Sequence, residues 1–517
     1  MRPLSSISIR SLLLPLAALL LGTTNPDPGP NALYLCMYCN DMMGLNTGAY
    51  VENYLSFQAA NGNRAVGIGN YESYNEEQLD RAKKAGVKVY GTGYERTVFL
   101  DQLADRKERE SPKEAAKRNI LAQLMKLDKT KPITIHISDH GWNGGLNGDG
   151  TLPPEKSGMA VKMQSNPFEE GIPELILTHG EFAELLTKAG LTGPKAPPVR
   201  IVAEHCYGGG VHWISQQFPN VCTAAFTDNK NVNWISDDEA GSMWRYVGAE
   251  KKAGRTPTLF EGFYAGWSAK DREDSVGGAL GSTQFVKDVL QKRGIQTEDL
   301  GQWTSLDWST WNNFSTLTGD IMKKGKKRTT AEETPSCPSE YYILPKVTSP
   351  QVFTDAEKVI NTLLPENSSP ILDTYRQALK DLQQNEANYR QLAGDMKLRI
   401  ERLRDQWGDL KSDEKAAASR DYTDSFGTFT DWAMGKFEET RQADLTKAKG
   451  DQRKTFDEYL KWRNQNAPIL AKYFREKEYV DRFAELKTFT DAYAKGKVTE
   501  AEMNQYRRML QCESLPL

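Results

Sequence analysis

The sequence carries little net charge and few residues of the types that bind transition metals. Its 66 Lys and Arg nearly balance 69 Asp and Glu, which leaves a formal charge of -3. Without a charge surplus the protein has no global attraction for polyanions, so we expect no nucleic-acid partner. Only five His and six Cys are present, and Cys36 and Cys39 form a CxxC with no second such pair. A zinc hydrolase built from these residues is therefore disfavoured.

A long hydrophobic run occurs once, near the start of the chain. Arg2 and Arg10 are followed by an apolar stretch at residues 12–21 and a Pro-rich exit, a pattern typical of an export signal over residues 1–30. The run is too short to span a bilayer comfortably, and no other stretch is apolar enough to do so. We expect a secreted or periplasmic protein with no stable membrane insertion after signal removal. A buried N-terminal helix is the alternative.

The cysteine content suits an oxidising compartment but does not fix the pairing. Cys36 and Cys39 either close as a disulfide or are simply buried at the end of an apolar strand. A bridge between Cys337 and Cys512 would connect a linker to the C-terminus. The sequence leaves these pairings open.

Short apolar runs alternate with amphipathic stretches through residues 31–322. The predicted strands cover residues 32–38, 87–90, 133–137 and 199–203, and the predicted helices cover residues 76–85, 112–127 and 179–189. This alternation predicts crossover units and an α/β fold around a mostly parallel sheet. In such sheets the functional residues collect beyond the carboxyl ends of the strands.

The composition changes at residue 323. Residues 323–350 are basic and Pro-rich, which predicts an exposed linker that proteases cut readily. Residues 351–517 are predicted to form an all-α domain, a helical bundle or antiparallel coiled coil that serves packing and interaction. Further helices at residues 426–437 and 456–462 are expected to cover the apolar stripe of its first long helix. The stripe consists of Leu372, Tyr375, Leu379, Leu382, Tyr389, Met396, Ile400, Leu403, Trp407 and Leu410, with Glu386 and Ala393 in the two remaining seam positions.

Two predicted strands end in residues suited to nucleophilic catalysis. One runs into the sequence S-D-H-G, which ends at Gly141, and the other into E-H-C-Y-G-G-G around Cys206. A thiol attacks carbonyl groups well when an imidazole, here that of His140, removes its proton and returns one to the leaving group. Because Gly141 has no side chain, its N–H can stabilise an oxyanion together with the N–H of Cys206. An inert, buried thiol is the alternative for Cys206.

The two blocks together resemble the legumain branch of the caspase-like cysteine peptidases. The resemblance covers residues 32 to about 289 and implies a three-layer α/β sandwich with no metal or organic cofactor. It implies that His140 is general base and acid, Cys206 the nucleophile and Gly141 an oxyanion donor. It also implies that Asn46, in the loop after the first strand, orients the catalytic histidine.

The same resemblance implies substrate contacts for two acidic residues. Glu204 matches the Glu that precedes the nucleophile by two and helps to form the primary specificity pocket, and Asp228 ends the strand that lines the substrate groove. The Arg that legumains carry in their first loop to select Asn side chains is absent between Asn40 and Asn46. Cleavage after Asn and cleavage after Lys or Arg both stay open, the latter on charge complementarity.

The remaining histidines are expected to have structural roles. We expect His136, His179 and His212 to be satisfied locally, as buried polar groups usually are. His205 adjoins Cys206, but alternation along the strand points its side chain to the opposite face, so it is disfavoured as the base.

These expectations define a cysteine endopeptidase that cleaves protein or peptide substrates through a thioester acyl-enzyme. Two alternatives remain: a caspase-like module that binds or assembles without turnover, and a transamidase or ligase that passes the same acyl group to an amine. The helical region is predicted to cover the active site until the linker is cut, as legumains also have a helical C-terminal prodomain.

Overall fold

The computed structural model describes most of the chain outside the N-terminus and several loops. The described residues are 30–37, 47–62, 64–69, 99–101, 105–144, 152–161, 175–231, 239–268, 277–297, 347–363, 370–407 and 450–517. Several predictions fall outside these residues: the export signal, Asn46, the strand at 87–90, the helices at 76–85 and 426–437, and most of the 323–350 linker.

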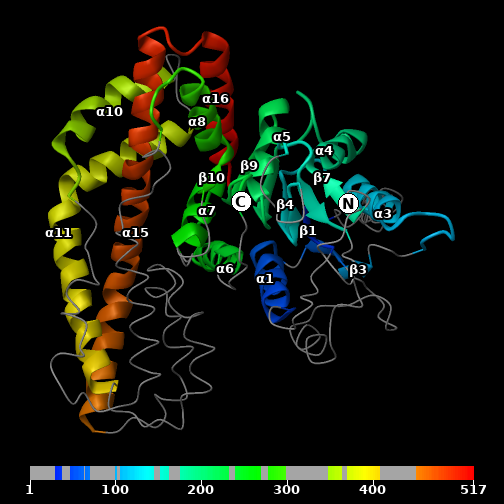
Figure 1. Ribbon diagram of the computed structural model, residues 1–517. Coiled ribbons are helices and arrows are strands. Elements are labelled where there is room, and N and C mark those ends of the chain that lie inside the picture. Colours follow the sequence, from blue (N-terminus) through cyan, green and yellow to red (C-terminus); the bar gives the residue numbers. More distant parts are fainter. Residues whose placement is uncertain are drawn as a thin grey trace, which may run out of the picture.

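A seven-stranded sheet forms the centre of the N-terminal part (Figure 1). Its strands are β1 (Ala32–Cys36), β2 (Ala65–Gly69), β3 (Phe99–Asp101), β4 (Ile133–Ser138), β8 (Val199–Glu204), β9 (Val221–Thr227) and β10 (Gly277–Leu280). They lie in the order β10-β9-β8-β4-β1-β2-β3, and all neighbours pair in parallel except β9 and β10. The predicted α/β fold with a mostly parallel sheet is therefore confirmed.

Helices cover both faces of this sheet, which gives three layers. The side chains of β1 divide by alternation, with Leu33 and Leu35 in one apolar cluster and Tyr34 and Cys36 in the other. The first cluster is closed by α3 (Pro112–Lys126), α4 (His179–Lys188) and α5 (His212–Gln217). The second is closed by α1 (Thr47–Ala60), α6 (Glu239–Lys252) and α7 (Leu259–Ser268). Strands buried on both faces are usually rich in apolar residues, and every residue of β1, β4, β8 and β9 is buried.

Local capping explains where two of the predicted helices begin. The Ser111 side chain accepts a hydrogen bond from the Glu114 N–H at 3.2 Å, and Pro112 occupies the first turn of α3. Thr178 and Glu181 form a reciprocal capping box at the start of α4. Both helices end within one residue of their predicted limits.

A small antiparallel sheet follows β4 directly. It contains β5 (Gly141–Trp142), β6 (Gly158–Ala160) and β7 (Ile176–Thr178), in that order. Only Asp139 and His140 separate the end of β4 from the start of β5. The chain therefore passes from the large sheet into the small one at the predicted catalytic histidine.

The C-terminal region is helical, as predicted. It consists of α10 (Pro350–Leu363), α11 (Pro370–Trp407), α15 (Asp451–Ala494) and α16 (Glu500–Glu513), and the two longest helices run side by side (Figure 1). On α11, the predicted stripe residues Tyr375, Leu379, Leu382 and Tyr389 are buried. The predicted helix at residues 456–462 is part of the much longer α15.

This helical region shares its hydrophobic core with the sheet. One apolar cluster contains Phe226 of β9, Phe285 of α8 (Gly281–Gln291), Phe489 of α15 and Met509 of α16. The rings of Phe285 and Phe489 lie 6.2 Å apart between centroids. Within the described part of the chain, none of the helices combines the length and the hydrophobicity needed to cross a bilayer.

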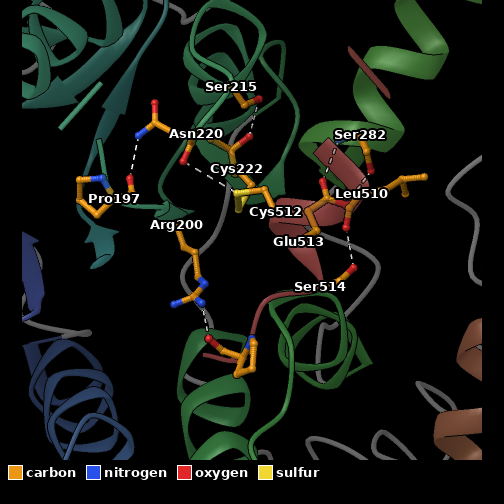
Figure 2. Close-up of a disulfide and its surroundings, with 12 residues drawn as sticks. Pro197, Arg200, Ser215, Asn220, Cys222, Ser282, Leu510, Cys512, Glu513 and Ser514 are labelled. Carbon is orange, nitrogen blue, oxygen red and sulfur yellow. Dashed lines mark hydrogen bonds between the residues drawn. A yellow bond between two sulfur atoms is a disulfide. The ribbon is translucent and has the colours of Figure 1, made fainter. Parts of the chain in front are cut away.

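A disulfide joins α16 to the central sheet (Figure 2). It connects Cys512 with Cys222 near the start of β9, 290 residues earlier, so of the pairings that the sequence left open, the one between Cys337 and Cys512 does not form. The reason is tertiary: α16 packs along β9, which brings the two thiols together. Cys36 is also disulfide-bonded.

Buried polar contacts reinforce the same junction. The Glu513 carboxylate accepts hydrogen bonds from the Ser282 N–H at 2.9 Å and hydroxyl at 2.7 Å, and it pairs with Arg482 of α15 (Figure 2 shows Glu513 and Ser282). Glu513 thereby caps the first turn of α8, where the local sequence supplies no capping side chain. Burial raises the pKa of Glu513. The C-terminal tail continues past it, and Arg200 donates to the Pro516 carbonyl.

Candidate functional site

The parallel pairing of β4 and β8 brings His140 and Cys206 to the same edge of the sheet. Ser138 pairs with Glu204 at the end of both strands, so residues 140 and 206 each lie two positions beyond a matched pair. The ladder extends one step further, because the Asp139 N–H donates to the Glu204 carbonyl at 3.3 Å. The predicted pair therefore lies at adjacent strand exits, at the carboxyl ends where such folds carry their functional groups.

Gly141 shows how closely the two exits approach each other. A Cβ added at residue 141 would lie 1.7 Å from the carbonyl oxygen of Cys206 and 2.7 Å from Nδ1 of His205. No side chain fits there, so only glycine permits this backbone contact. The predicted oxyanion donor Gly141 is therefore in direct contact with the backbone of the predicted nucleophile.

Asp139 fixes one side of the backbone at His140, where the chain leaves β4. Its buried carboxylate accepts hydrogen bonds from the N–H of Met37 at 2.9 Å and from the N–H of His140 at 2.7 Å. Met37 directly follows β1, so Asp139 connects the end of that strand to His140, the predicted catalytic histidine. The small sheet holds the other side, because the His140 carbonyl accepts a hydrogen bond from the Ala160 N–H at 2.8 Å.

Cys206 lies in a three-residue turn between β8 and a short 3₁₀ helix, η4 (Gly208–Val211). It is a half-buried thiol, outside any disulfide. The next residue, Tyr207, has a φ of 60°, a left-handed conformation that costs a residue with a side chain about 1–2 kcal/mol. Backbone strain of this kind persists where neighbouring contacts impose it and is common at functional sites.

The three glycines after Tyr207, residues 208–210, are buried. A Cβ at Gly210 would lie 2.4 Å from the Ser157 hydroxyl and 2.5 Å from Nδ1 of His179. The absence of side chains at these glycines therefore allows η4 to pack closely against Ser157 and His179. The turn that carries Cys206 is therefore tightly packed.

Glu204, predicted to contact substrate, is fully buried in this structure. Its carboxylate accepts hydrogen bonds from Asn53 Nδ2 at 3.0 Å, from the Ser138 hydroxyl at 2.9 Å and from the N–H of Ala240 at 3.1 Å. The Nε2 atom of His136 lies 3.5 Å away. A role for Glu204 in substrate recognition stays a prediction, and its observed contacts connect β4, α1 and α6.

Asp228, the second predicted substrate contact, directly follows β9 and is half-buried. Its Oδ1 accepts from the N–H groups of Lys230 at 2.7 Å and Asn231 at 2.8 Å, and its Oδ2 accepts from Asn231 Nδ2 at 2.8 Å. Both oxygens thus organise the turn after β9. Substrate contact by Asp228 stays a prediction, as does the orienting role of Asn46, which lies outside the described residues.

The other four histidines are buried and make local contacts. His136 accepts a hydrogen bond from Trp244 Nε1 at 3.3 Å and stacks on Tyr34 at 5.1 Å. His136 and His140 are four residues apart, a spacing that would align two ligands on a helix, but here they belong to a strand and its exit. Within the described ranges, no three His, Cys, Asp or Glu side chains converge in a way that could hold a metal ion.

Burial lowers the pKa of three of these histidines. The pKa falls to about 3 for His179, to about 4 for His205 and to about 3 for His212, with desolvation as the largest cause in each case. His179 and His205 stack with ring centroids 5.4 Å apart. These side chains are therefore neutral near pH 7 and act through hydrogen bonding and packing.

Sequence reasoning missed two groups of site residues. Asp139 was seen only as part of the S-D-H-G block, although a buried acid beside a strand end is a candidate backbone anchor. The turn of Asp228 to Asn231 was missed as well, although D-N-K-N after an apolar strand is a turn signal. Comparison with known proteins adds nothing to this assignment, since no family model and no curated protein matches the chain.

Proposed function

We propose that the protein is a cysteine endopeptidase of the legumain branch of caspase-like peptidases, with Cys206 as nucleophile and His140 as general base and acid. The observation that supports this most strongly is the β4–β8 register, in which Ser138 pairs with Glu204. The tight backbone contact between Gly141 and Cys206 adds to it.

The reaction needs only groups at these strand exits. His140 takes the proton of the Cys206 thiol, and the thiolate attacks the carbonyl carbon of the substrate peptide. The N–H groups of Gly141 and Cys206 donate hydrogen bonds to the oxyanion that forms. The peptide C–N bond then breaks, His140 gives its proton to the departing amine, and a thioester remains on Cys206. Water, deprotonated by His140, attacks the thioester carbon, the C–S bond breaks, and His140 returns the proton to the Cys206 sulfur as the carboxylic acid is released.

The test combines covalent labelling with turnover. A peptide acyloxymethyl ketone should add once to Cys206, as read by intact mass and peptide mapping, and fluorogenic peptides should be cleaved. Cys206→Ala and His140→Ala should each lower kcat/KM by about 10³-fold or more. Lys188→Ala, at an exposed position on α4, is the matched control and should leave turnover unchanged.

Three outcomes separate the competing functions. An unlabelled Cys206, before and after cutting of the linker, would overturn the peptidase in favour of a binding module. A product that gains the mass of an added amine would identify a transamidase or ligase. A peptide-library profile then decides between cleavage after Asn and cleavage after Lys or Arg.

The predicted covering of the site by the helical region needs an experiment that leaves the core intact. Residues of α10, α11, α15 and α16 contribute to the apolar cluster of the sheet, so deleting them would expose that cluster to water. Limited proteolysis within the 323–350 linker is the better test. A rise in turnover after the cut supports covering, and unchanged turnover rejects it.

A further inference from the structure

The peptide bond that follows Cys206 is held at both of its polar atoms. The Cys206 carbonyl oxygen lies 2.8 Å from Nδ1 of His205, and the Tyr207 N–H donates to the Asn231 carbonyl at 2.9 Å. One contact comes from the β8 exit itself, and the other comes from the turn after β9. Together they fix the plane of the peptide and so the backbone conformation of Cys206.

The His205 contact defines the protonation of its ring. A carbonyl oxygen only accepts hydrogen bonds, so Nδ1 must carry the proton. Burial lowers the pKa of His205 to about 4, which keeps the ring neutral near pH 7. Its Nε2 is buried and has no hydrogen-bond partner among the described residues, as suits a nitrogen that bears a lone pair rather than a second proton.

Neighbouring residues hold the ring in this orientation. His205 stacks on His179, whose Nδ1 lies 3.1 Å from both the Ser157 hydroxyl and the Pro154 carbonyl. Stacking against a ring that is itself anchored leaves His205 little freedom to rotate. The hydrogen-bond donor beside Cys206 is therefore fixed before any substrate arrives.

Asn231, whose carbonyl accepts the hydrogen bond from the Tyr207 N–H, is itself held in place by its neighbours. Asp228 binds the backbone and side-chain N–H groups of Asn231, each at 2.8 Å, and the Thr227 hydroxyl donates to the Asn231 carbonyl at 3.3 Å. This carbonyl therefore faces the Tyr207 N–H. Tyr207 needs such a restraint because its backbone adopts the left-handed conformation.

We propose that His205 is a positioning residue for the nucleophile, an inference that rests on the proposed catalytic role of Cys206. Its Nδ1–H holds the Cys206 carbonyl, while Asn231 holds the following N–H. The restrained peptide keeps the thiol and the oxyanion-binding N–H of Cys206 in the orientation that attack requires. Because a displacement of about 1 Å can cost 10²-fold in rate, losing this donor should lower kcat far more than it changes KM.

Two amide substitutions separate the donor from the bulk of the side chain. In His205→Asn the amide nitrogen occupies roughly the position of Nδ1, whereas in His205→Gln it reaches toward Nε2. We expect His205→Gln to lower kcat about 10- to 100-fold with KM within about 3-fold, and His205→Asn to restore kcat to within about 3-fold of the parent. His212→Gln is the matched control, because His212 is equally buried but contacts the Thr223 hydroxyl at 2.8 Å.

Each result decides the proposal. Equal kcat values for the Asn and Gln variants would overturn it, and so would a loss in His212→Gln as large as that in His205→Gln. Failure of the Asn variant to fold would also overturn it, since the donor would then serve the fold rather than the nucleophile.

A second measurement separates this proposal from the proposed function. If the parent protein neither cleaves peptides nor takes up the ketone probe, the peptidase fails while the positioning role is still measurable. The alkylation rate of Cys206 by iodoacetamide, followed against pH by peptide mass, should match the parent in His205→Asn and differ in His205→Gln. The same rate profile in all three proteins would overturn the positioning role.

Discussion

The two edges of the central sheet are built in different ways. At the amino edge, the starts of β8 and β9 are tied to the C-terminus by the Cys222–Cys512 disulfide and by the contact from Arg200 to Pro516. At the carboxyl edge, His140 and Cys206 are held by backbone contacts, neutral histidines and a glycine that no other residue can replace. The ties that join β8 and β9 to the C-terminus thus lie at the edge where no chemistry is proposed. The carboxyl edge, which carries the Cys206 thiol, relies on many weaker, directional contacts. Such contacts can orient a reactive group without reacting with it.

Removal of the Cys222–Cys512 disulfide should destabilise the amino edge of the sheet and leave the activity at the carboxyl edge unchanged. Cys222→Ala combined with Cys512→Ala should lower the free energy of unfolding by up to about 5 kcal/mol, because the bridge closes a very long loop. Urea denaturation checks the stability. Turnover at temperatures where the variant remains folded should equal that of the parent, and a selective loss of kcat would mean that the two edges are coupled.

Acid should weaken the protein through its buried histidines. His179, His205 and His212 have folded pKa values of about 3 to 4 and regain a pKa near 6.5 on unfolding. The unfolded chain therefore binds more protons below pH 6.5, so stability is full above that pH and falls as the pH drops toward the folded values. The expected slope is about 1.4 kcal/mol per pH unit for each histidine.

His212 offers a clean way to assign that slope. In urea titrations between pH 6.5 and 5, His212→Leu should show a loss per pH unit that is smaller than that of the parent by about 1.4 kcal/mol. An unchanged slope would mean that His212 takes up its proton in the folded state as well. The carboxylates contribute equally to both proteins, so the difference isolates one imidazole.

A pair of glycine substitutions compares the site with an open helix surface. Gly141→Ala should lower kcat/KM by about 10²-fold or more, because its Cβ would displace the Cys206 carbonyl and the N–H that we propose binds the oxyanion. Gly394, within α11, has nothing within 4 Å of an added Cβ, so Gly394→Ala should stabilise the protein by about 0.5–1 kcal/mol. Peptide turnover and thermal unfolding check the two effects. Normal activity in Gly141→Ala would contradict the oxyanion role.

Periodicity was sufficient to predict the layers of the fold but not every strand. The largely apolar runs at residues 133–137 and 199–203 predicted β4 and β8, because strands buried on both faces are rich in apolar residues. β2 escaped prediction, since its sequence A-V-G-I-G carries two glycines and no long apolar run. The limits of α3 and α4 were predicted from helical spacing, and in the structure capping by Ser111 and Thr178 fixes where both helices begin.

The site was predictable only where its chemistry is local in sequence. His140, Gly141 and Cys206 stand in short blocks whose residue types suggest a reaction. The contacts of Asn231 and the pairing of Cys512 with Cys222 depend on packing between distant segments. They therefore cannot be predicted from the spacing of residues in the sequence. The burial of Glu204 has the same origin, because Asn53 and Ala240 reach it from two helices that close the same layer.

The bridge between Cys222 and Cys512 also closes residues 222–512 into a ring, from which residues 1–221 and residues 513–517 extend. Hydrolysis of any one peptide bond between residues 223 and 511, the basic linker included, would open this ring without separating its pieces. A nicked protein would therefore gain the mass of one water and migrate as a single species until a reductant is added. Proteolytic cleavage in the linker would therefore break one peptide bond of this molecule while the disulfide keeps all of its residues covalently joined.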